Sequence, residues 1–374
     1  MILGFDAKRF FHNKTGLGNY SRDLIRILAQ YNSENNYLLY NPKPKKIDRI
    51  LIDGKIIIER LPENKKDRKL SSLWRLFSVS SQIKKDKVEL FHGLSGEIPI
   101  GLNKTGVKIV VTIHDLIFMR YPNLYSFFDR KIHYYKFKYA ANKADLVIAI
   151  SEQTKKDIIT YLNINPDKIK VIYQGCAPVF KEEIPSEFIE FTRKKYNLPL
   201  NFVLNVGTIE KRKNVLSIIK AIKEIDTKLV VIGKKTAYFT EINTYILENN
   251  LQNKVIFLEN VELKELASIY RMATVFIYPS VFEGFGIPII EALYSNTPVI
   301  TSKGGCFSEA GGENSIYINA LNPEELRSEL INLLENSEKR EAMKNGGLQF
   351  VQKFNDENVA KNWIETYNDV LRLS

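Results

Sequence analysis

The chain has 374 residues, which is too long for one hydrophobic core and predicts two domains. Charged residues within positions 1–10 argue against a signal peptide, and no apolar run is long enough for a membrane-spanning helix. The only two cysteines, Cys176 and Cys306, lie far apart and match no disulfide or metal framework. We therefore expect a protein of the reducing cytoplasm.

Positive charge is concentrated in the first half of the chain. Residues 1–180 hold 31 Lys and Arg against 17 Asp and Glu, a net charge of +14, whereas the remainder holds 23 against 26, a net charge of −3. Such asymmetry indicates an anionic partner for the first half, and nucleic acid, an anionic membrane or a phosphorylated acceptor would each fit. The alternative is a solvated, Lys-rich surface with no partner.

Short apolar runs typical of buried strands alternate with helical patterns along the chain. In the first half we expect strands at residues 1–5, 37–40, 108–113, 146–150 and 169–172, and helices at 18–31, 70–84, 129–144 and 152–161. In the second half we expect strands at 202–206, 228–232, 255–257, 274–277, 298–301 and 315–318, and helices at 214–224, 263–271, 288–294, 323–335 and 338–350. This alternation predicts an α/β protein with two Rossmann-like, doubly wound parallel-sheet domains that face a cleft. Ligands of such sheets bind beyond the carboxyl ends of the strands.

The strongest motif follows the expected strand 274–277. It reads Pro-Ser-Val-Phe-Glu-Gly-Phe-Gly-Ile-Pro over residues 279–288. Gly284 and Gly286 let backbone amides approach a ligand, and Pro288 suits the first position of a helix whose N-terminus would attract an anion. Glu283 and Glu291 flank this loop, and ionised carboxylates accept hydrogen bonds from sugar hydroxyls. The alternative is a tight turn with Glu291 complementing the helix dipole.

A second motif follows the expected strand 202–206 and reads Gly-Thr-Ile-Glu-Lys-Arg-Lys-Asn over residues 207–214. Gly207 frees the backbone after the strand, while Arg212 and Lys213 are suited to hold two phosphates. Three cations at a helix start oppose the helix dipole, so a bound diphosphate would explain them better than a solvated charge run.

Two further motifs lie in the first half. Gly16 and Gly18 open the helix expected at 18–31 and are interpreted as a flexible glycine loop, because they lack the strand spacing and acidic partner of a dinucleotide-binding fingerprint. His114 and Asp115 follow the expected strand 108–113. A lone histidine is most often structural, but this place at the carboxyl end of a strand favours the cleft.

The glutamates at 283 and 291 with the intervening Gly-Phe-Gly-Ile-Pro, followed by Thr-Pro-Val-Ile at 297–300, resemble the signature of the group 1 (family 4) retaining glycosyltransferases, which have the GT-B fold. The resemblance extends to residues 207–214, 16–18, 114–115 and 149–157, and so covers nearly the whole chain.

On this resemblance, Glu291 would bind the ribose hydroxyls of the donor and Glu283 would contact the transferred sugar. Arg212 and Lys213 would hold the diphosphate, helped by the backbone amides of Gly284, Phe285 and Gly286. The strand-end residue Gly207 and its neighbour would complete the donor site. That neighbour is Thr208. Many members of the family carry a basic residue at this position, and Arg212 would take over the role of that residue.

The resemblance also assigns the first half. His114 would lie close to the sugar, Asp115 would stand on the acceptor side, and Gly16 and Gly18 would shape a loop that closes on donor and acceptor. The expected domains are residues 1–180, on the acceptor side, and 181–356, which binds the nucleotide sugar. The last helix, about 357–374, would pack back on the first domain.

The expected reaction moves a sugar from a nucleoside diphosphate, for example GDP-mannose, to a glycan or polyprenyl-diphosphate-linked acceptor in envelope polysaccharide synthesis. No Asp-x-Asp pair stands in a suitable loop, so we expect no metal and no other cofactor. Peripheral contact with an anionic membrane is expected from residues 65–77, where Leu70, Leu73, Trp74 and Phe77 have helical spacing beside a basic run.

Three alternatives remain at this point. A catalytically inactive relative would still bind the nucleotide sugar. A nicotinamide oxidoreductase would need the dinucleotide fingerprint that this chain lacks. A nucleic-acid-binding protein would suit the sequence pI of about 9.2, but the basic residues follow no known binding module, so we expect no nucleic-acid partner.

Overall fold

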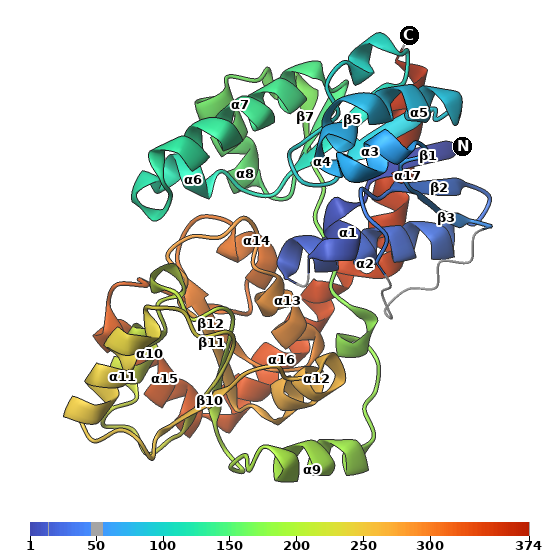
Figure 1. Cartoon of the computed structure of the whole chain (residues 1–374). Helices are drawn as coiled ribbons and strands as arrows, with labels where there is room; N and C mark the ends of the chain where they lie inside the picture. Colours follow the sequence, from blue (N-terminus) through green and yellow to red (C-terminus); the bar gives the residue numbers. More distant parts are fainter. Residues whose placement is uncertain (14, 46–54, 374) are drawn as a thin grey trace. The chain divides into compact units, whose positions relative to one another are not determined.

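The computed structural model describes residues 1–13, 15–45 and 55–373. It divides the chain into two compact units (Figure 1). Unit 1 comprises Met1–Gly175 and Phe354–Ser374, and unit 2 comprises Cys176–Lys353. The division thus falls a few residues before the expected boundaries after 180 and 356.

Unit 1 contains a sheet of seven parallel strands in the order β3-β2-β1-β4-β5-β6-β7. The strands are β1 (Ile2–Asp6), β2 (Asn36–Tyr40), β3 (Ile57–Arg60), β4 (Leu90–Gly93), β5 (Lys108–Ile113), β6 (Leu146–Ala149) and β7 (Ile169–Val171). Five of them match the expected positions, whereas β3 and the central β4 were not expected. The apolar strands are buried on both faces, as a parallel sheet covered by helices requires.

Helices cover both faces of this sheet (Figure 1). The helices are α1 (Lys8–His12), α2 (Gly16–Tyr31), α3 (Lys65–Lys69), α4 (Ser71–Leu73), the π-helix η1 (Trp74–Ser78), α5 (Val79–Lys85), α6 (Ile117–Arg120), α7 (Phe127–Lys143), α8 (Glu152–Asp157), the π-helix η4 (Ile158–Leu162) and α17 (Asp356–Arg372). One core cluster joins the sheet to α2 and α17, and a second joins it to η1, α5 and α7.

The last helix, α17, is held on the sheet of unit 1 by a buried polar chain. Tyr367 of α17 hydrogen-bonds through its hydroxyl to His92 Nδ1 at 2.8 Å. The other ring nitrogen, Nε2, lies 2.8 Å from Thr112 Oγ1, which lies 3.3 Å from the Tyr20 hydroxyl of α2. Burial lowers the pKa of His92 to about 3, so the ring is neutral and serves structure.

Unit 2 contains six parallel strands in the order β10-β9-β8-β11-β12-β13. All six were expected: β8 (Val203–Val206), β9 (Leu229–Ile232), β10 (Val255–Leu258), β11 (Val275–Tyr278), β12 (Val299–Ser302) and β13 (Ile316–Ile318). The helices are α9 (Ser186–Lys195), α10 (Val215–Ala221), α11 (Phe239–Glu248), α12 (Leu263–Met272), α13 (Ile287–Tyr294), α14 (Phe307–Gly311), α15 (Pro323–Glu335) and α16 (Ser337–Val351).

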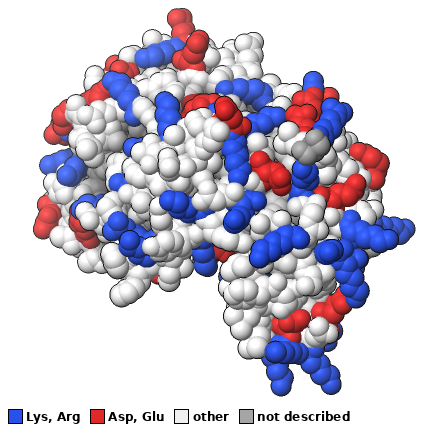
Figure 2. All heavy atoms as spheres, turned by 90° about the horizontal axis from the view of Figure 1, so that it is seen from above, with Lys and Arg blue, Asp and Glu red and all other residues white. Residues whose placement is uncertain are grey.

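Surface charge is mixed on the face drawn in Figure 2, where Lys and Arg lie among acidic and uncharged residues and form no single basic field. Within the described residues, every helix is too short or too polar to cross a lipid bilayer.

Candidate active site

The loop after β8 begins with a backbone conformation that favours glycine. Gly207 has φ of +147°, and its amide donates to the Ile232 carbonyl at 2.9 Å. Thr208 follows it, partly buried, and residues 211–213 form a single 3₁₀ turn, η7 (Lys211–Lys213). Asn214 then adopts a left-handed conformation with φ of +58°, and α10 starts only at Val215. The three cations therefore stand on a turn before the helix, not on the helix itself.

The loop after β11 ends at Gly286, which has φ of +111° and is the N-cap of α13. The helix begins at Ile287. Pro288 therefore occupies the second helical position, whereas the first was expected. Gly284 is buried, and so are Phe282 and Phe285, whose rings fix the loop. The structure thus places a buried turn at the start of a helix, directly after a central strand.

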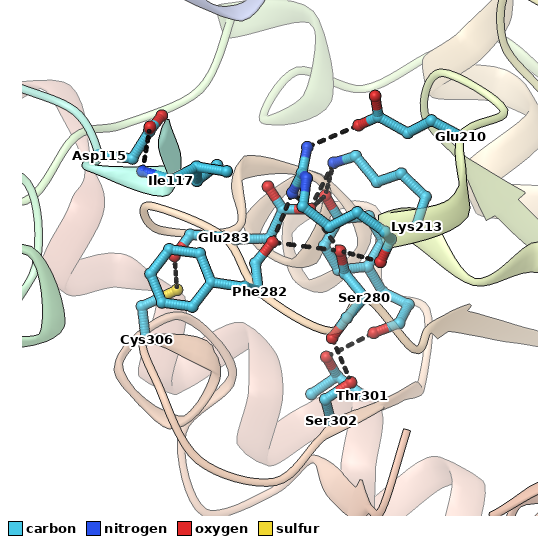
Figure 3. A network of polar contacts seen from close by, with 12 residues as sticks. Asp115, Ile117, Glu210, Lys213, Ser280, Phe282, Glu283, Thr301, Ser302 and Cys306 are labelled. Carbon is cyan, nitrogen blue, oxygen red and sulfur yellow. Dashed lines mark hydrogen bonds and ion pairs between the residues drawn. The ribbon is translucent and has the colours of Figure 1, made fainter. Parts of the chain in front are cut away.

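Four donors converge on one carboxylate oxygen, Oε1 of Glu283 (Figure 3). They are Lys213 Nζ at 2.5 Å, Ser280 Oγ at 2.6 Å, an Arg212 guanidinium nitrogen at 2.8 Å and the Tyr278 hydroxyl at 2.9 Å. The Glu283 side chain is 12% exposed. The cations of the first loop and the glutamate of the second therefore form one site.

Arg212 connects the two loops. Its guanidinium also donates to the Phe282 carbonyl and, at 2.6 Å, to Glu210. Its backbone carbonyl accepts from the Val281 amide at 2.9 Å. Burial opposes the charged form of Arg212, but Glu283 and Glu210 raise its pKa above the usual value.

Glu283 is ionised despite its burial. Burial on its own would raise the pKa of this carboxyl, but Lys213 and Arg212, with the hydrogen bonds they and Ser280 donate, lower it to about 2. Lys213 Nζ also donates to the Tyr278 hydroxyl and lies 4.8 Å from the centre of that ring. A buried anion with two close cations is a preorganised electrostatic site.

Glu291 belongs to a different hydrogen-bond network. It is the fifth residue of α13, beyond the first turn of the helix, and its Oε2 accepts from the Tyr270 hydroxyl of α12 at 3.0 Å. Burial raises the pKa of Glu291 to about 7, and the hydrogen bond from Tyr270 only partly offsets this. Its charge therefore changes near neutral pH, unlike that of Glu283.

Gly16 and Gly18 lie in the first turn of α2, which begins two residues before the expected helix, so neither glycine lies in an extended loop. A Cβ on Gly18 would stand 1.9 Å from the Asn13 carbonyl oxygen, whereas one on Gly16 would meet nothing within 4 Å. Gly18 therefore allows a close backbone approach, and helix packing explains it better than flexibility does.

His114 and Asp115 follow β5 at the carboxyl edge of the unit 1 sheet, as expected. Burial lowers the pKa of His114 to about 4, so the ring is neutral and donates from Nε2 to the Leu94 carbonyl at 2.9 Å. The Tyr20 ring meets it edge-on, with centroids 4.5 Å apart. Asp115 Oδ1 accepts from the amide of Ile117, the first residue of α6, at 3.1 Å.

The sequence interpretation missed several polar residues at the same sheet edges. In unit 2 these are Tyr278 and Ser280, which bond Glu283. In unit 1, Asp6 ends β1 and accepts from Arg75, which also donates to Glu97 at 2.7 Å. The signal was present, because Tyr278 and Asp6 are strand-end residues, but Asp6 and its partner Arg75 lie 69 positions apart in the sequence.

The described ranges contain no cluster of three or more His, Cys, Asp or Glu side chains arranged to hold a metal ion.

Comparisons with known proteins indicate the family of this chain. Residues 188–350 match the family described as glycosyl transferases group 1, and residues 15–178 match glycosyltransferase family 4. The O-antigen chain mannosyltransferase RfbU of Salmonella typhimurium is 31% identical over 63% of this chain and 62% of that protein, which is less than two thirds of either. The O-antigen chain mannosyltransferase B of Escherichia coli is 23% identical over 98% of this chain and 99% of its own length.

Among solved structures, Anabaena Alr3699/HepE in complex with UDP-glucose superposes with a TM-score of 0.76 at 20% identity and covers 98% of this chain and 99% of that one. At this identity the likeness concerns the fold. These matches remove the oxidoreductase alternative. The chain belongs to the group 1 (family 4) glycosyltransferases and is a transferase enzyme with the two Rossmann-like domains of the GT-B fold.

Proposed function

We propose that this protein transfers a mannosyl residue from GDP-mannose, or a similar hexosyl donor, to a glycan or polyprenyl-diphosphate-linked acceptor during envelope polysaccharide synthesis, with retention of configuration. The mannosyltransferase relatives support the sugar, because their names describe mannose transfer onto O-antigen chains. The positive charge of residues 1–180 supports an anionic acceptor for unit 1.

The observation that carries the proposal is the arrangement of Glu283. All four donors reach Oε1. The other oxygen, Oε2, belongs to a carboxyl whose pKa is lowered to about 2, so it is negative at working pH and suited to accept hydrogen bonds from hydroxyls of the transferred sugar.

The reaction breaks the bond between the anomeric carbon and the diphosphate oxygen and forms a bond to an acceptor hydroxyl oxygen. Negative charge grows on the leaving diphosphate, where Lys213, Arg212 and the amides around Gly284, Phe285 and Gly286 stabilise it. One such preorganised donor is worth about 3–4 kcal/mol in comparable sites. The departing phosphate oxygen takes the acceptor proton, and the acceptor attacks from the face that the phosphate leaves.

In this proposal Glu291 binds the donor ribose, while Gly207 and Thr208 shape the floor of the diphosphate site. His114 stands near the sugar and Asp115 on the acceptor side. The neutral state of His114 suits a hydrogen-bond donor or acceptor to sugar hydroxyls better than an ion-pair partner.

The test is a panel of sugar nucleotides, with GDP and UDP donors compared for saturable binding and then for transfer to lipid-linked and free glycan acceptors. We expect GDP-mannose to bind and to be consumed, and the anomeric configuration of the product, read by NMR, to match that of the donor. Saturable donor binding without any turnover would favour the catalytically inactive relative instead.

A further inference from the structure

The apolar surface of unit 1 is unusually exposed along α7. Phe128, Ile132 and Tyr135 are 76%, 53% and 64% exposed, and Phe127 precedes them at 61%. The positions 128, 131, 132 and 135 have the i, i+3, i+4, i+7 spacing of one helix face. These side chains, with Lys131, therefore form a continuous stripe, which we call the α7 stripe.

The helix keeps this stripe outward because its other side is anchored. Ala140 and Ala141 are buried in the core below α7, and Phe137 packs against the same core. Lys136 Nζ lies 3.3 Å from Glu97 Oε1, and Glu97 Oε2 accepts from Arg75. The aromatic residues of the stripe are thus displayed by a fixed helix and are not frayed ends of a loop.

The charges around the stripe have one sign. Residues 124–143 contain five Lys and Arg against one acidic residue, Asp129. Lys131 Nζ lies 5.7 Å from the centre of the Phe127 ring, and Lys138 Nζ lies 5.3 Å from that of Tyr134. Basic and aromatic side chains therefore alternate on one surface, as in helices that lie in the headgroup region of an anionic bilayer.

A stretch expected from the sequence to contact the membrane, residues 65–77, fits less well. Trp74 is 2% exposed and belongs to the core. Leu70, Leu73 and Phe77 are exposed, but Arg75 between them is committed to Asp6 and Glu97. Leu70, Leu73 and Phe77 thus form a second group of exposed apolar side chains, on helices that cover the same face of the sheet as α7. This group serves as the comparison in the experiment below.

We propose that the α7 stripe docks unit 1 on an anionic lipid surface, with Phe128, Ile132 and Tyr135 inserted among the acyl chains and Lys131 paired with lipid phosphates. The inference rests on the proposed function, because a lipid-linked acceptor would be presented at such a surface. A second copy of the chain is the poorer occupant, since two basic stripes would repel each other.

The experiment is co-sedimentation of the whole protein with vesicles of phosphatidylcholine containing increasing phosphatidylglycerol. We expect binding to rise with the anionic fraction and to weaken as salt is raised from about 0.1 M to about 1 M, where the Debye length shrinks to about 3 Å. The variant Phe128→Ser/Ile132→Ser should reduce partitioning at least about tenfold, because it removes two large apolar side chains from the contact.

Two matched controls make the result specific. Leu200→Ser/Leu321→Ser removes two side chains of unit 2 that are 77% and 73% exposed, and it should leave binding unchanged. Leu73→Ser/Phe77→Ser should have a much smaller effect than the α7 variant. Failure of the wild type to bind at low salt, full binding by the α7 variant, or equal losses in all three variants would overturn the proposal.

The outcome is separable from that of the proposed function. Titration with GDP and turnover of GDP-mannose test the donor site in solution and do not require vesicles. If donor binding persists while vesicles are ignored, only the docking surface fails. Sedimentation velocity of the wild type and the α7 variant tests whether the stripe instead binds a second copy of the chain. A dimer that is present in the wild type and lost in the variant would assign the stripe to that contact and overturn lipid docking.

Discussion

The ammonium nitrogen of Lys213 lies 2.5 Å from Oε1 of Glu283, an oxygen that Arg212 also contacts at 2.8 Å. Both cations are therefore positioned by the protein before they meet any phosphate. Their charge is partly balanced by the glutamate, so a diphosphate would be held by groups that need little reorganisation. Electrostatic stabilisation of a leaving group depends on this kind of prior placement.

Lys213→Ala should impair transfer far more than Lys211→Ala. The Lys213 side chain is 14% exposed and contacts Glu283 and Tyr278, whereas Lys211 is exposed. Charge on the diphosphate grows in the transition state, so we expect kcat to fall by roughly 100-fold or more for Lys213→Ala and little for Lys211→Ala. Steady-state kinetics measures this, with thermal denaturation as a check on folding. Equal, small effects on kcat at both positions would show that Lys213 does not stabilise the leaving diphosphate.

Glu291→Ala should weaken binding of free GDP, whereas Glu283→Ala should leave GDP binding nearly intact and reduce transfer. The two carboxylates have separate partners, Tyr270 for Glu291 and the two cations for Glu283. Isothermal titration of both variants with GDP separates the ribose role from the sugar role. The opposite pattern, with GDP affinity lost only in Glu283→Ala, would reverse the assignment.

Binding of GDP should strengthen as pH rises from 6 to 8, because burial raises the pKa of Glu291 to about 7 and ribose hydroxyls need its ionised form. The change attributable to Glu291 should be about tenfold, since ionisation of such a group rises from about a tenth to nearly complete over this range. The phosphate itself titrates nearby, so the control is Glu291→Gln, in which only the phosphate contribution persists. Identical pH profiles would contradict the prediction.

The same raised pKa has a stability consequence in the free protein. The folded form of Glu291 holds its proton more tightly than the unfolded chain, whose ordinary value is 4.5. The resulting stabilisation is fully present below that value and is lost as pH rises through about 7.

Turnover should persist in excess EDTA. The described residues offer no carboxylate or histidine cluster for a metal, and Arg212 and Lys213 provide positive charge for the leaving group. The assay is transfer from GDP-mannose with chelator, with and without added Mg²⁺ or Mn²⁺. Activity that disappears with EDTA and returns with either metal would refute a metal-independent reaction.

Gly18→Ala should destabilise unit 1, while Gly16→Ala should be neutral or slightly stabilising. A Cβ at position 18 collides with the Asn13 carbonyl, whereas the space around Gly16 is open. At an open helical position, alanine in place of glycine raises the free energy of unfolding by up to about 1 kcal/mol, whereas a clash with the backbone lowers it by more than that. Thermal denaturation of the two variants compares them directly. Similar losses for both would instead support a shared need for flexibility.

The sequence was most informative in unit 2. All six of its strands are short apolar runs, and the motifs at 207–214 and 279–288 follow two adjacent strands, β8 and β11, in the sheet. Because the carboxyl ends of parallel strands meet at one edge of a sheet, the sequence alone predicts Lys213 and Glu283 at the same edge.

What the sequence could not indicate were contacts between distant residues. The central strand β4 contains His92, a polar residue that weakens the apolar pattern, and its burial depends on Tyr367, 275 positions away. The pKa values of Glu283 and Glu291 are shifted in opposite directions, and this too depends on contacts that the sequence does not show. Glu283 contacts two cations, which lower its pKa, whereas buried Glu291 contacts only a tyrosine hydroxyl, and its pKa is raised.

The helix α17 follows all of unit 2 in the chain, yet its Val359, Trp363 and Tyr367 complete a core that β1 and α2 begin. On the ribosome, residues 1–175 therefore emerge without the part of that core which α17 supplies, and they stay so while unit 2 is made. Domains generally fold as they are synthesised, and unit 2 has its sequence in one piece. The half that is translated first is thus the last to close, and a nascent chain halted before Asp356 would present an apolar surface to chaperones.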